Sequence, residues 1–477
     1  MERIPSKSAD LSEWYQAVCY QAELVSQAPV RGCLVLRPYG MGLWERLQSE
    51  LDRRFKETGH ENAYFPLLIP ESLFAKEAEH VEGFAPEVAW VTEGGTEKLA
   101  ERLAIRPTSE VIVGVMYAEW IQSYRDLPVL INQWVNVMRW EKRTRPFLRT
   151  AEFLWQEGHT AHATEAEAAE EVARMLEVYR EVAEDICGVP VYTGEKSQSE
   201  RFAGAEHTYS IEGLMPDGRA LQSATSHELG QNFARTYDIT YAAEDQTLQH
   251  CWTTSWGMSW RMLGALIMTH GDDRGLRIPP KMAPTEVVIV PIPRGDTSAL
   301  DAAVRELYAR CKAAGLRVKL DDRAGQSPGY KFNEWDLRGV PIRLEIGNRD
   351  LEAGVATLVR RDKAVKEDGQ KQQVPLAEVV EFIPAVLEQI QHSLFAQAKT
   401  FLQDHTLATL DRAEFLRLLK GRAGMVDVPW CGLPECEAAV KDATGATTRN
   451  LRRPARAERC VPCGEPARWQ AYFAQSY

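Results

Sequence analysis

Hydrophobic residues recur at every third or fourth position early in the chain, at Trp44, Leu47, Leu51 and Phe55. This spacing predicts a helix with one buried face. Gly59 is placed to end that helix, because glycine tolerates the backbone conformation found at helix ends. The apolar segment from Ala63 to Ile69 then indicates a strand.

The next part of the chain alternates between helical and strand patterns. A segment rich in alanine and glutamate, Ala166 to Ile186, predicts a long helix. Short strand-like segments follow at Tyr209 to Glu212 and Leu221 to Thr225, and the apolar segment Met262 to Met268 again has a helical pattern. Such clusters are typical of an α+β domain, which we expect at residues 1–280.

The proline-rich segment Ile278 to Pro284 marks a linker before a second domain. Beyond it, strand and helix patterns alternate, at Glu286 to Pro291, Leu300 to Ala314, Arg317 to Leu320, Lys331 to Leu337 and Ile342 to Ile346. This alternation predicts an α/β domain at residues 281–391. We expect a small α+β domain at residues 392–477, beginning with a helix from Leu394 to Gly421.

Four of the nine cysteines lie close together near the C-terminus, at Cys431, Cys436, Cys460 and Cys463. Two close pairs separated by a loop are suited to a structural zinc ion held by four thiolates. The alternative is four reduced thiols in a loop-rich tail. Disulfides are not expected in a chain without an export signal.

Composition narrows the class of protein. A chain of 477 residues, 44% of them hydrophobic, is long enough for two or three domains with cores of their own. No apolar run approaches the roughly 18 to 20 residues of a membrane-spanning helix, and the polar N-terminus lacks a signal-peptide core, so we expect a cytoplasmic location. The net charge of −12 argues against a non-selective coat on nucleic acid, but allows a selective RNA partner.

Two arginines flank a basic turn in the most informative segment of the chain. Arg139 precedes the turn, Arg149 follows it, and Phe153 lies just beyond. Two guanidinium groups on a short hairpin can bracket a phosphate, because each offers several permanently charged donors. Phe153 can then stack on a purine. By itself, the pattern also fits a solvated surface hairpin with salt-bridged arginines.

Further motifs stand around this hairpin, and in order and spacing they resemble class II aminoacyl-tRNA synthetases. The segment ending at Leu68 resembles their motif 1, the hairpin motif 2, and the segment ending at Arg261 motif 3. The closer resemblance, to prolyl-tRNA synthetases, rests on the strings Phe84 to Val91, Arg106 to Glu110, Leu221 to His227 and His270 to Leu276. It runs from Trp14 to Tyr477. Three residues separate Gly257 from Arg261 in motif 3, a departure from the class pattern that prolyl enzymes share.

The resemblance implies three domains: a class II catalytic domain on an antiparallel sheet at 1–280, an anticodon-binding domain at 281–391 and a zinc-binding domain at 392–477. It also implies the reaction. Proline and ATP, with Mg²⁺, form prolyl-adenylate, and the prolyl group is then transferred to the 3′-terminal ribose of tRNA(Pro). Motif 1 is expected to build a homodimer.

The resemblance implies roles for individual residues as well. Arg139 and Arg261 are the expected catalytic residues, with Arg139 at the α-phosphate. The expected ATP-binding set is Arg139, Glu141, Arg149, Thr150, Phe153, Gln222, Thr225, Ser259 and Arg261. Gln222 is the residue placed nearest magnesium and ribose.

The proline pocket must hold a secondary ammonium, a carboxylate and an apolar ring. The expected set is Thr108, Glu110, Arg139, Trp155, His159, Phe202, His227 and Ser255. Glu110 pairs with the ammonium and Arg139 holds the carboxylate, whereas His227 also fits a structural role. A loop with Phe84, Glu87 and Val88 is expected to cover the site.

A ring pocket discriminates poorly against smaller amino acids, since a missing methylene is worth only about 1 to 3 kcal/mol. We therefore expect alanine to be activated as well. Only 122 positions separate Arg139 from Arg261, which leaves no room for the large hydrolytic insertion of some prolyl enzymes. The chain resembles the compact archaeal and eukaryotic type, without editing of mischarged tRNA in cis.

The tRNA is expected to contact both ends of the molecule. Its terminal ribose would pass over Arg143 and Arg145, and its anticodon bases would be read in the second domain. The candidate readers are Lys331, Glu345, Arg349 and Asp350, for which ordinary surface charge is the alternative. The basic run Arg449 to Arg456 either binds phosphate or is solvated, and Tyr477 is expected to fold back toward the catalytic domain.

Two other classes of protein remain open at this point. One is a synthetase of the same subclass for another amino acid, because the Thr108-Ser109-Glu110 segment also resembles seryl enzymes. The other is a synthetase-like RNA-binding or regulatory protein without catalysis. Such proteins usually lose an ATP-binding arginine, whereas Arg139 and Arg261 are both present here.

Overall fold

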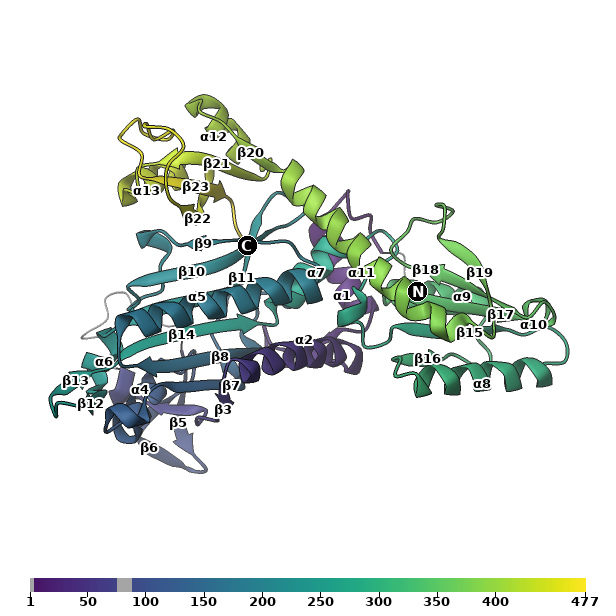
Figure 1. Cartoon of the computed structure of the whole chain (residues 1–477), viewed down its shortest axis with the longest axis horizontal. Helices are drawn as coiled ribbons and strands as arrows, with labels where there is room; N and C mark the ends of the chain where they lie inside the picture. Colours follow the sequence, from purple (N-terminus) through teal and green to yellow (C-terminus); the bar gives the residue numbers. More distant parts are fainter. Residues whose placement is uncertain (1–3, 75–87) are drawn as a thin grey trace.

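The computed structural model describes residues 4–74 and 88–477 and shows three regions in chain order (Figure 1). The first region holds a large antiparallel sheet with helices α2 and α5 beside it, and the second holds a smaller sheet. The long helix α11 (Val379–Asp404) runs from the second region to the third, which contains the C-terminal strands.

Helix α2 (Pro38–Glu57) confirms the first predicted helix. Its buried face includes the four predicted positions from Trp44 to Phe55. Pro38 occupies the first turn, where a missing amide hydrogen removes no helical bond. The helix stops just before Gly59, whose φ of 90° lies in the left-handed region. Helix α1 (Leu11–Gln21) packs into the same core through Trp14.

The large sheet positions most of the expected site residues. Its strands in the first region are, in spatial order, β9 (Tyr192–Glu195), β10 (His207–Leu214), β11 (Ala220–Gly230), β14 (Trp252–Ser259), β8 (Glu152–His162), β7 (Val129–Met138) and β3 (Glu61–Asn62). All neighbours are antiparallel except β3 and β7. Helices α5 (Glu165–Glu181) and α7 (Arg261–His270) contact this sheet. A Cβ at Gly158 would lie 2.1 Å from the Trp256 ring, so this close approach requires glycine.

The predicted strand from Ala63 to Ile69 was wrong in its extent. Strand β3 ends at Asn62, just before this segment, and only its last two residues belong to a strand, the short β4 (Leu68–Pro70). Between them, the Ala63 amide donates to the Asn132 carbonyl at 2.8 Å, and the Phe65 amide donates to the Gln133 side chain at 3.0 Å. Pro66 has no amide to donate. The segment therefore crosses from one sheet to another.

A smaller layer lies beside the large sheet. It contains a three-stranded sheet and two short helices: β4, β5 (Ala89–Gly94), β6 (Glu97–Ile105), α4 (Glu110–Trp120) and α6 (Asn232–Tyr237). Two strand pairs complete the first region: β1 (Val25–Gln27) with β2 (Leu34–Leu36), and β12 (Thr240–Ala242) with β13 (Leu248–His250).

The second region confirms the predicted α/β alternation. Its sheet has the order β16 (Val318–Leu320), β15 (Val287–Ile292), β17 (Ile342–Gly347), β18 (Val355–Arg360) and β19 (Lys371–Pro375). Its helices are α8 (Ser298–Ala313), α9 (Pro328–Leu337) and α10 (Asn348–Glu352). The linker before it is irregular apart from one 3₁₀ turn, Pro280–Met282, and Met282 is buried in the core of the first region.

The helix predicted from Leu394 to Gly421 was wrong in both its limits. Helix α11 begins earlier and ends at Asp404, and the chain then forms β20 (Thr406–Ala408) and α12 (Arg412–Lys420). Strand β20 pairs with β21 (Met425–Trp430), and the Asp411 carboxylate caps α12 by accepting the Glu414 amide at 2.7 Å. The expected domain boundary at residue 391 falls inside α11. Among the described residues, neither α11 nor any other helix is both long and apolar enough to cross a membrane.

The third region is joined to the first through the sheet. Strands β20, β21, β23 (Trp469–Ala474) and β22 (Thr447–Arg452) lie side by side, and β22 also pairs with β9 at Leu451 and Glu195. Within the described residues this gives one sheet of eleven strands. Helix α13 (Pro434–Thr444) packs on β22. The C-terminal region is therefore an extension of the first region's sheet, next to β9 and β10 (Figure 1).

Candidate active site

Two neighbouring hollows lie on the large sheet, and Arg139 lines both. The larger, of about 240 Å³, is lined by Thr108, Glu110, Arg139, Trp155, Glu157, Glu200, Phe202, Thr208, Gln222, Thr225, His227, Ser255, Trp256 and Gly257. The smaller is lined by Arg139, Glu141, Phe147, Leu148, Arg149, Thr150, Phe153, Ser259, Trp260 and Arg261. A guanidinium shared by both can contact two ligands at the point where they meet.

The motif 2 hairpin holds Arg139 at this junction. Strands β7 and β8 pair up to Met138 and Glu152, and the Arg139 amide donates to the Ala151 carbonyl at 2.8 Å. The Arg139 Nε donates to the Pro107 carbonyl at 3.1 Å. Its Cζ lies 5.4 Å from the ring centres of both Phe153 and Trp155, although Arg139 remains accessible in the cleft.

Three arginines gather around the smaller hollow. Arg261 donates from Nε to the Leu148 carbonyl at 3.0 Å, and Arg149 Nε lies 2.9 Å from Glu141 Oε1. Loss of hydration, and then repulsion from Arg139 and Arg149, lower the pKa of Arg261 to about 10. Arg261 remains charged at neutral pH, and a bound polyphosphate would relieve the repulsion among the three cations.

The structure separates the expected ATP-binding residues into two groups. Glu141, Arg149, Thr150, Phe153 and Ser259 line the smaller hollow together with Arg139 and Arg261. Gln222 and Thr225 line the larger one. The Thr150 hydroxyl is buried and has no hydrogen-bond partner among the described residues, which leaves it free to bind a ligand.

The expected role of Gln222 beside magnesium does not fit its surroundings. Its side-chain oxygen, the atom that would bind a metal, accepts a hydrogen bond from the Lys196 ammonium at 3.0 Å. Lys196 is itself buried and close to Glu212. A divalent cation at that oxygen would meet a positive charge, so the site favours a hydroxyl or another neutral partner.

Seven of the eight expected proline-site residues line the larger hollow; His159 is the exception. Thr108 donates to the Glu110 carboxylate, at the start of α4. The Phe202 and His227 rings are 4.6 Å apart. The aromatic side chains and the acidic group thus face one cavity.

His227 both lines the cavity and has a structural partner. Its Nδ1 lies 3.0 Å from the Thr208 hydroxyl. Burial, with the nearby positive charges of His159, Lys196 and Arg139, lowers the pKa of His227 to about 3. The imidazole is therefore neutral at physiological pH and acts as a hydrogen-bonding group.

His159, expected as a wall of the proline ring, is not among the residues that line the larger hollow. It is buried, and its Nε2 lies 3.1 Å from Glu157 Oε2. Glu157 lines the hollow instead, and it also accepts hydrogen bonds from Ser109 and Gln133. The contact with His159 holds the pKa of the Glu157 carboxyl below its usual value although burial opposes this.

The lining residues that sequence reasoning missed are Glu157, Glu200, Thr208, Trp256 and Gly257 in the larger hollow and Phe147, Leu148 and Trp260 in the smaller. The period of two along a strand would have identified Glu157, because it shares a face of β8 with Trp155. No local signal marks Glu200, which comes from a separate 3₁₀ turn. Of the expected covering loop, Phe84 and Glu87 lie outside the described residues, and Val88 packs against the core beside α4 and α6.

The four candidate anticodon readers have different surroundings. Lys331 is buried, and its ammonium donates to the Asp321 carbonyl at 2.9 Å. Glu345 is also buried, between Arg343 and Lys371. Asp350 accepts the Gly347 amide at 2.8 Å, while Arg349 is exposed on α10. The structure therefore leaves Arg349 available to a base and engages the other three within the protein.

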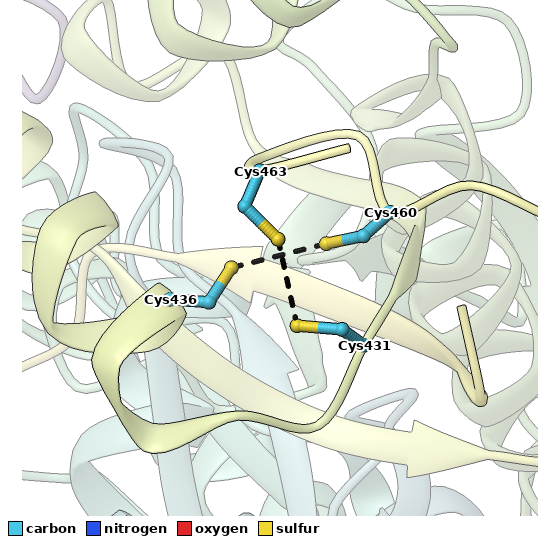
Figure 2. Close-up of side chains that lie close together, drawn as sticks. All are labelled: Cys431, Cys436, Cys460 and Cys463. Carbon is cyan, nitrogen blue, oxygen red and sulfur yellow. Dashed lines mark hydrogen bonds between the residues drawn. The ribbon is translucent and has the colours of Figure 1, made fainter. Parts of the chain in front are cut away.

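The four C-terminal cysteines converge as the sequence predicts. Figure 2 shows their side chains pointing toward one another, and their sulfur atoms all lie within 4.8 Å of one another. Cys436 and Cys460 are 3.8 Å apart, and Cys431 and Cys463 are 3.7 Å apart. A tetrahedron with zinc–sulfur bonds of about 2.3 Å has edges of about 3.8 Å, so these thiols fit a zinc ion.

The basic run near the cysteines is neither fully solvated nor free for phosphate. Arg449 is buried and paired with Glu212 at 2.8 Å. Arg452 lies 2.6 Å from Asp427, and Arg453 stacks over the Trp469 ring at 3.9 Å. Both expectations for the run are thus corrected: most of its arginines are held by intramolecular contacts.

Tyr477 folds back onto the first region as expected. Its hydroxyl donates to Asp217 Oδ2 at 2.9 Å, and its amide donates to the Ala220 carbonyl at 3.2 Å. Ala220 begins β11, the strand that carries Gln222 and Thr225. The C-terminal segment is thus in direct contact with an active-site strand.

An antiparallel sheet that carries motif 2 and motif 3 arginines around two adjoining hollows defines a class II aminoacyl-tRNA synthetase. Residues 90–270 match the family model described as tRNA synthetase class II core domain (G, H, P, S and T). Residues 286–385 match the anticodon binding domain, and residues 412–477 match the C-terminal domain of prolyl-tRNA synthetase.

Comparison with curated relatives shows which family of class II synthetases the chain belongs to. A proline–tRNA ligase of Symbiobacterium thermophilum is 54% identical, with 100% of this chain and 99% of the relative covered. Proline–tRNA ligases of Rubrobacter xylanophilus and Natranaerobius thermophilus are 53% and 52% identical, again over 100% of this chain and 99% and 98% of the relatives. The chain belongs to the prolyl-tRNA synthetases, also called proline–tRNA ligases. These bacterial relatives show that its compact length is not confined to archaeal and eukaryotic enzymes.

Proposed function

We propose that the protein activates L-proline with ATP and transfers the prolyl group to the 3′-terminal ribose of tRNA(Pro). The observation that carries this proposal is the position of Arg139 between the two hollows. The proline carboxylate and the α-phosphate must meet for reaction, and a guanidinium at that junction can bind both. Because the product supplies protein synthesis, we place the reaction in the cytoplasm.

The first step needs no protein nucleophile. The proline carboxylate attacks the α-phosphorus of ATP, a bond forms from carboxylate oxygen to phosphorus, and pyrophosphate leaves. Arg139 stabilises the charge at the α-phosphate, while Arg149 and Arg261 bind the outer phosphates. Mg²⁺ bound to the phosphates of ATP would supply further charge neutralisation beside these arginines.

The larger hollow suits proline in its charges and shape. Glu110 lies in the hollow and can accept from the secondary ammonium, with Thr108 bonded to it. Trp155 and Phe202 offer apolar faces to the ring. These two apolar faces suit a proline ring better than a serine hydroxyl, which favours proline over the seryl alternative. The intact arginine set argues against a non-catalytic regulator.

Amino-acid-dependent ATP–pyrophosphate exchange tests this proposal. Across the twenty amino acids, without tRNA, the expected result is strong exchange with proline and weaker exchange with alanine. Exchange with another amino acid in place of proline would refute the pocket assignment and keep the class. No exchange from folded protein that binds tRNA would favour the regulatory alternative.

We further propose that mischarged alanine is not removed in cis. The chain between β8 and β14 forms α5, β9 to β13 and α6, all within or against the first region, with no additional domain in that fully described interval. Purified enzyme given alanyl-tRNA(Pro) is expected to hydrolyse it no faster than buffer does. Rapid hydrolysis would contradict the proposal.

Two structural roles complete the proposed function. The exposed apolar side chains of the motif 1 segment, including Tyr64 at 74% exposure, are suited to a homodimer interface. A zinc ion held by the four cysteines would cross-link the loops of the third region. Arg349 is the candidate anticodon contact that the fold leaves exposed.

A further inference from the structure

A buried ion pair joins the third region to the sheet that carries the active site. Arg449 on β22 is 3% exposed, and Glu212 on β10 is fully buried. The Arg449 Nη2 donates to the two Glu212 carboxylate oxygens at 2.8 and 3.1 Å, and its Nε lies 3.3 Å from Oε2. This forked contact fixes both side chains, because planar guanidinium and carboxylate groups match in geometry.

Glu212 in turn contacts Lys196, whose ammonium reaches the active site. The Lys196 Nζ lies 3.4 Å from Glu212 Oε1 and donates to Gln222 Oε1 at 3.0 Å. Glu200 Oε2 lies 3.7 Å from both Lys196 Nζ and Arg449 Nη1. Gln222 and Glu200 both line the larger hollow. Two cations and two carboxylates thus form one network with an active-site amide at its end.

The network also continues away from the active site. Glu437, next to Cys436 of the thiol cluster, accepts the Thr448 amide at 2.9 Å and the Thr448 hydroxyl at 2.5 Å. Thr448 is the residue before Arg449 on β22. The contact between Glu437 and Thr448 and the pair of Arg449 and Glu212 thus start from neighbouring residues of β22.

We infer that Arg449 is a positioning residue for nucleotide binding: through Glu212 it keeps Lys196 where the ammonium orients the side-chain amide of Gln222. This inference rests on the proposed activation of proline with ATP and on the nucleotide-binding role that the resemblance implies for Gln222. Arg449 contacts no substrate itself.

The geometry gives the direction of the effect. Without Arg449, the buried Glu212 carboxylate retains Lys196 as its nearest cation, and an unpaired buried charge is strongly unfavourable. Lys196 is then drawn to Glu212 and away from Gln222, whose amide loses its partner. Nucleotide binding weakens, while Glu110, which Thr108 holds outside this network, keeps its contact for the proline ammonium.

The test compares Arg449→Met with Arg452→Met in the full-length enzyme. Arg452 lies three residues away on the same strand, but its ion pair with Asp427 and its contact with the Tyr472 ring stay within the third region. Kinetics of pyrophosphate exchange give KM for ATP, KM for proline and kcat. Calorimetry with a non-hydrolysable ATP analogue gives Kd without any turnover, and thermal melting and metal content report on the fold.

The expected result for Arg449→Met is a rise of about tenfold in KM for ATP and in Kd for the analogue, with KM for proline changed less than about twofold. Arg452→Met should leave all three unchanged. Arg449→Lys keeps the charge without the fork and should give an intermediate rise. If Arg449→Met does not fold, Arg449→Lys is the deciding variant. An unchanged Kd of Arg449→Lys for the ATP analogue would overturn the inference.

The outcomes also separate this inference from the proposed function. A wild-type enzyme that binds the analogue but shows no exchange with proline would refute the proposed substrate, and the Kd ratio would still decide the role of Arg449. Equal Kd values for wild type and folded Arg449→Met would refute the positioning role alone. Weakened binding of proline and ATP to the same degree would indicate general distortion and would also overturn it.

Discussion

Arg139 keeps its charge in surroundings that oppose it. Loss of hydration lowers the pKa of its guanidinium. The nearby carboxylates of Glu110 and Glu157 oppose this shift in part. The Phe153 and Trp155 rings limit its movement. The result is a group of five donors held in a fixed direction at the junction of two hollows.

Replacing Arg139 by lysine tests that geometry at constant charge. Lysine presents a point charge and cannot hold a carboxylate and a phosphate together, so kcat/KM in proline-dependent exchange should fall by at least about 100-fold. Arg174→Lys, at an arginine on α5 paired with Glu170, is the matched control and should change little. Comparable losses in both variants would contradict the assigned role of Arg139.

His270 gives a prediction for pH. It is buried, its Nε2 donates to the Cys187 carbonyl at 3.0 Å, and burial lowers its pKa to about 3. In the unfolded state this histidine becomes protonated below about pH 6.5, whereas in the folded state it stays neutral down to about pH 3. The free energy of unfolding therefore decreases by about 1.4 kcal/mol per pH unit as pH falls from 6.5 toward 3.

The variant His270→Gln removes this titration and can keep a donor to the carbonyl. Between pH 7.5 and 5.5, urea unfolding should show a loss of stability about 1 kcal/mol smaller in the variant than in the wild type. Parallel losses in the two proteins would mean that His270 is protonated in the folded state.

Individual site residues were predictable where a motif carried them. Arg139, Glu110 and Arg261 were identified from their motifs, and all three line the two hollows. The sequence did not show which of the candidate residues would be buried. His159 and Lys331 have the side chains of binding residues, but tertiary contacts bury them against Glu157 and Asp321.

At the scale of elements, helices with a clear apolar period were predictable, and segments shaped by distant partners were not. Helices α2 and α5 follow their patterns. The segment after Asp404 has helical propensity, yet residues Thr406–Ala408 pair with β21 and form a strand. Pairing with a strand nearly twenty residues later cannot be read from a local window.

The cysteine cluster predicts a metal-dependent element. Cys436→Ser should lower the zinc content of the purified enzyme from about one ion per chain toward none and lower the melting temperature, because one of four ligands is lost. Elemental analysis and calorimetric melting measure both. Cys33→Ser, at a buried cysteine outside the cluster, should keep its metal. Equal metal content in the two variants would refute the site.

At the scale of the whole molecule, apolar side chains are exposed on the surface where the motif 1 segment ends. Tyr64, Leu67, Leu68 and Trp120 are all more than one-third exposed. A homodimer that covers these side chains should dissociate when Tyr64 is replaced by glutamate, because a charge would be buried without a partner. Sedimentation velocity should then show the monomer. Leu248→Glu, at a leucine 72% exposed on β13, should remain dimeric.

The continuity of the sheet from β9 into β22 has a consequence for any shortened form of the chain. Removing the third region would uncover the outer edge of β9 and leave Glu212 without Arg449. An open strand edge is a template for association with other chains. A truncated catalytic region should therefore tend to aggregate.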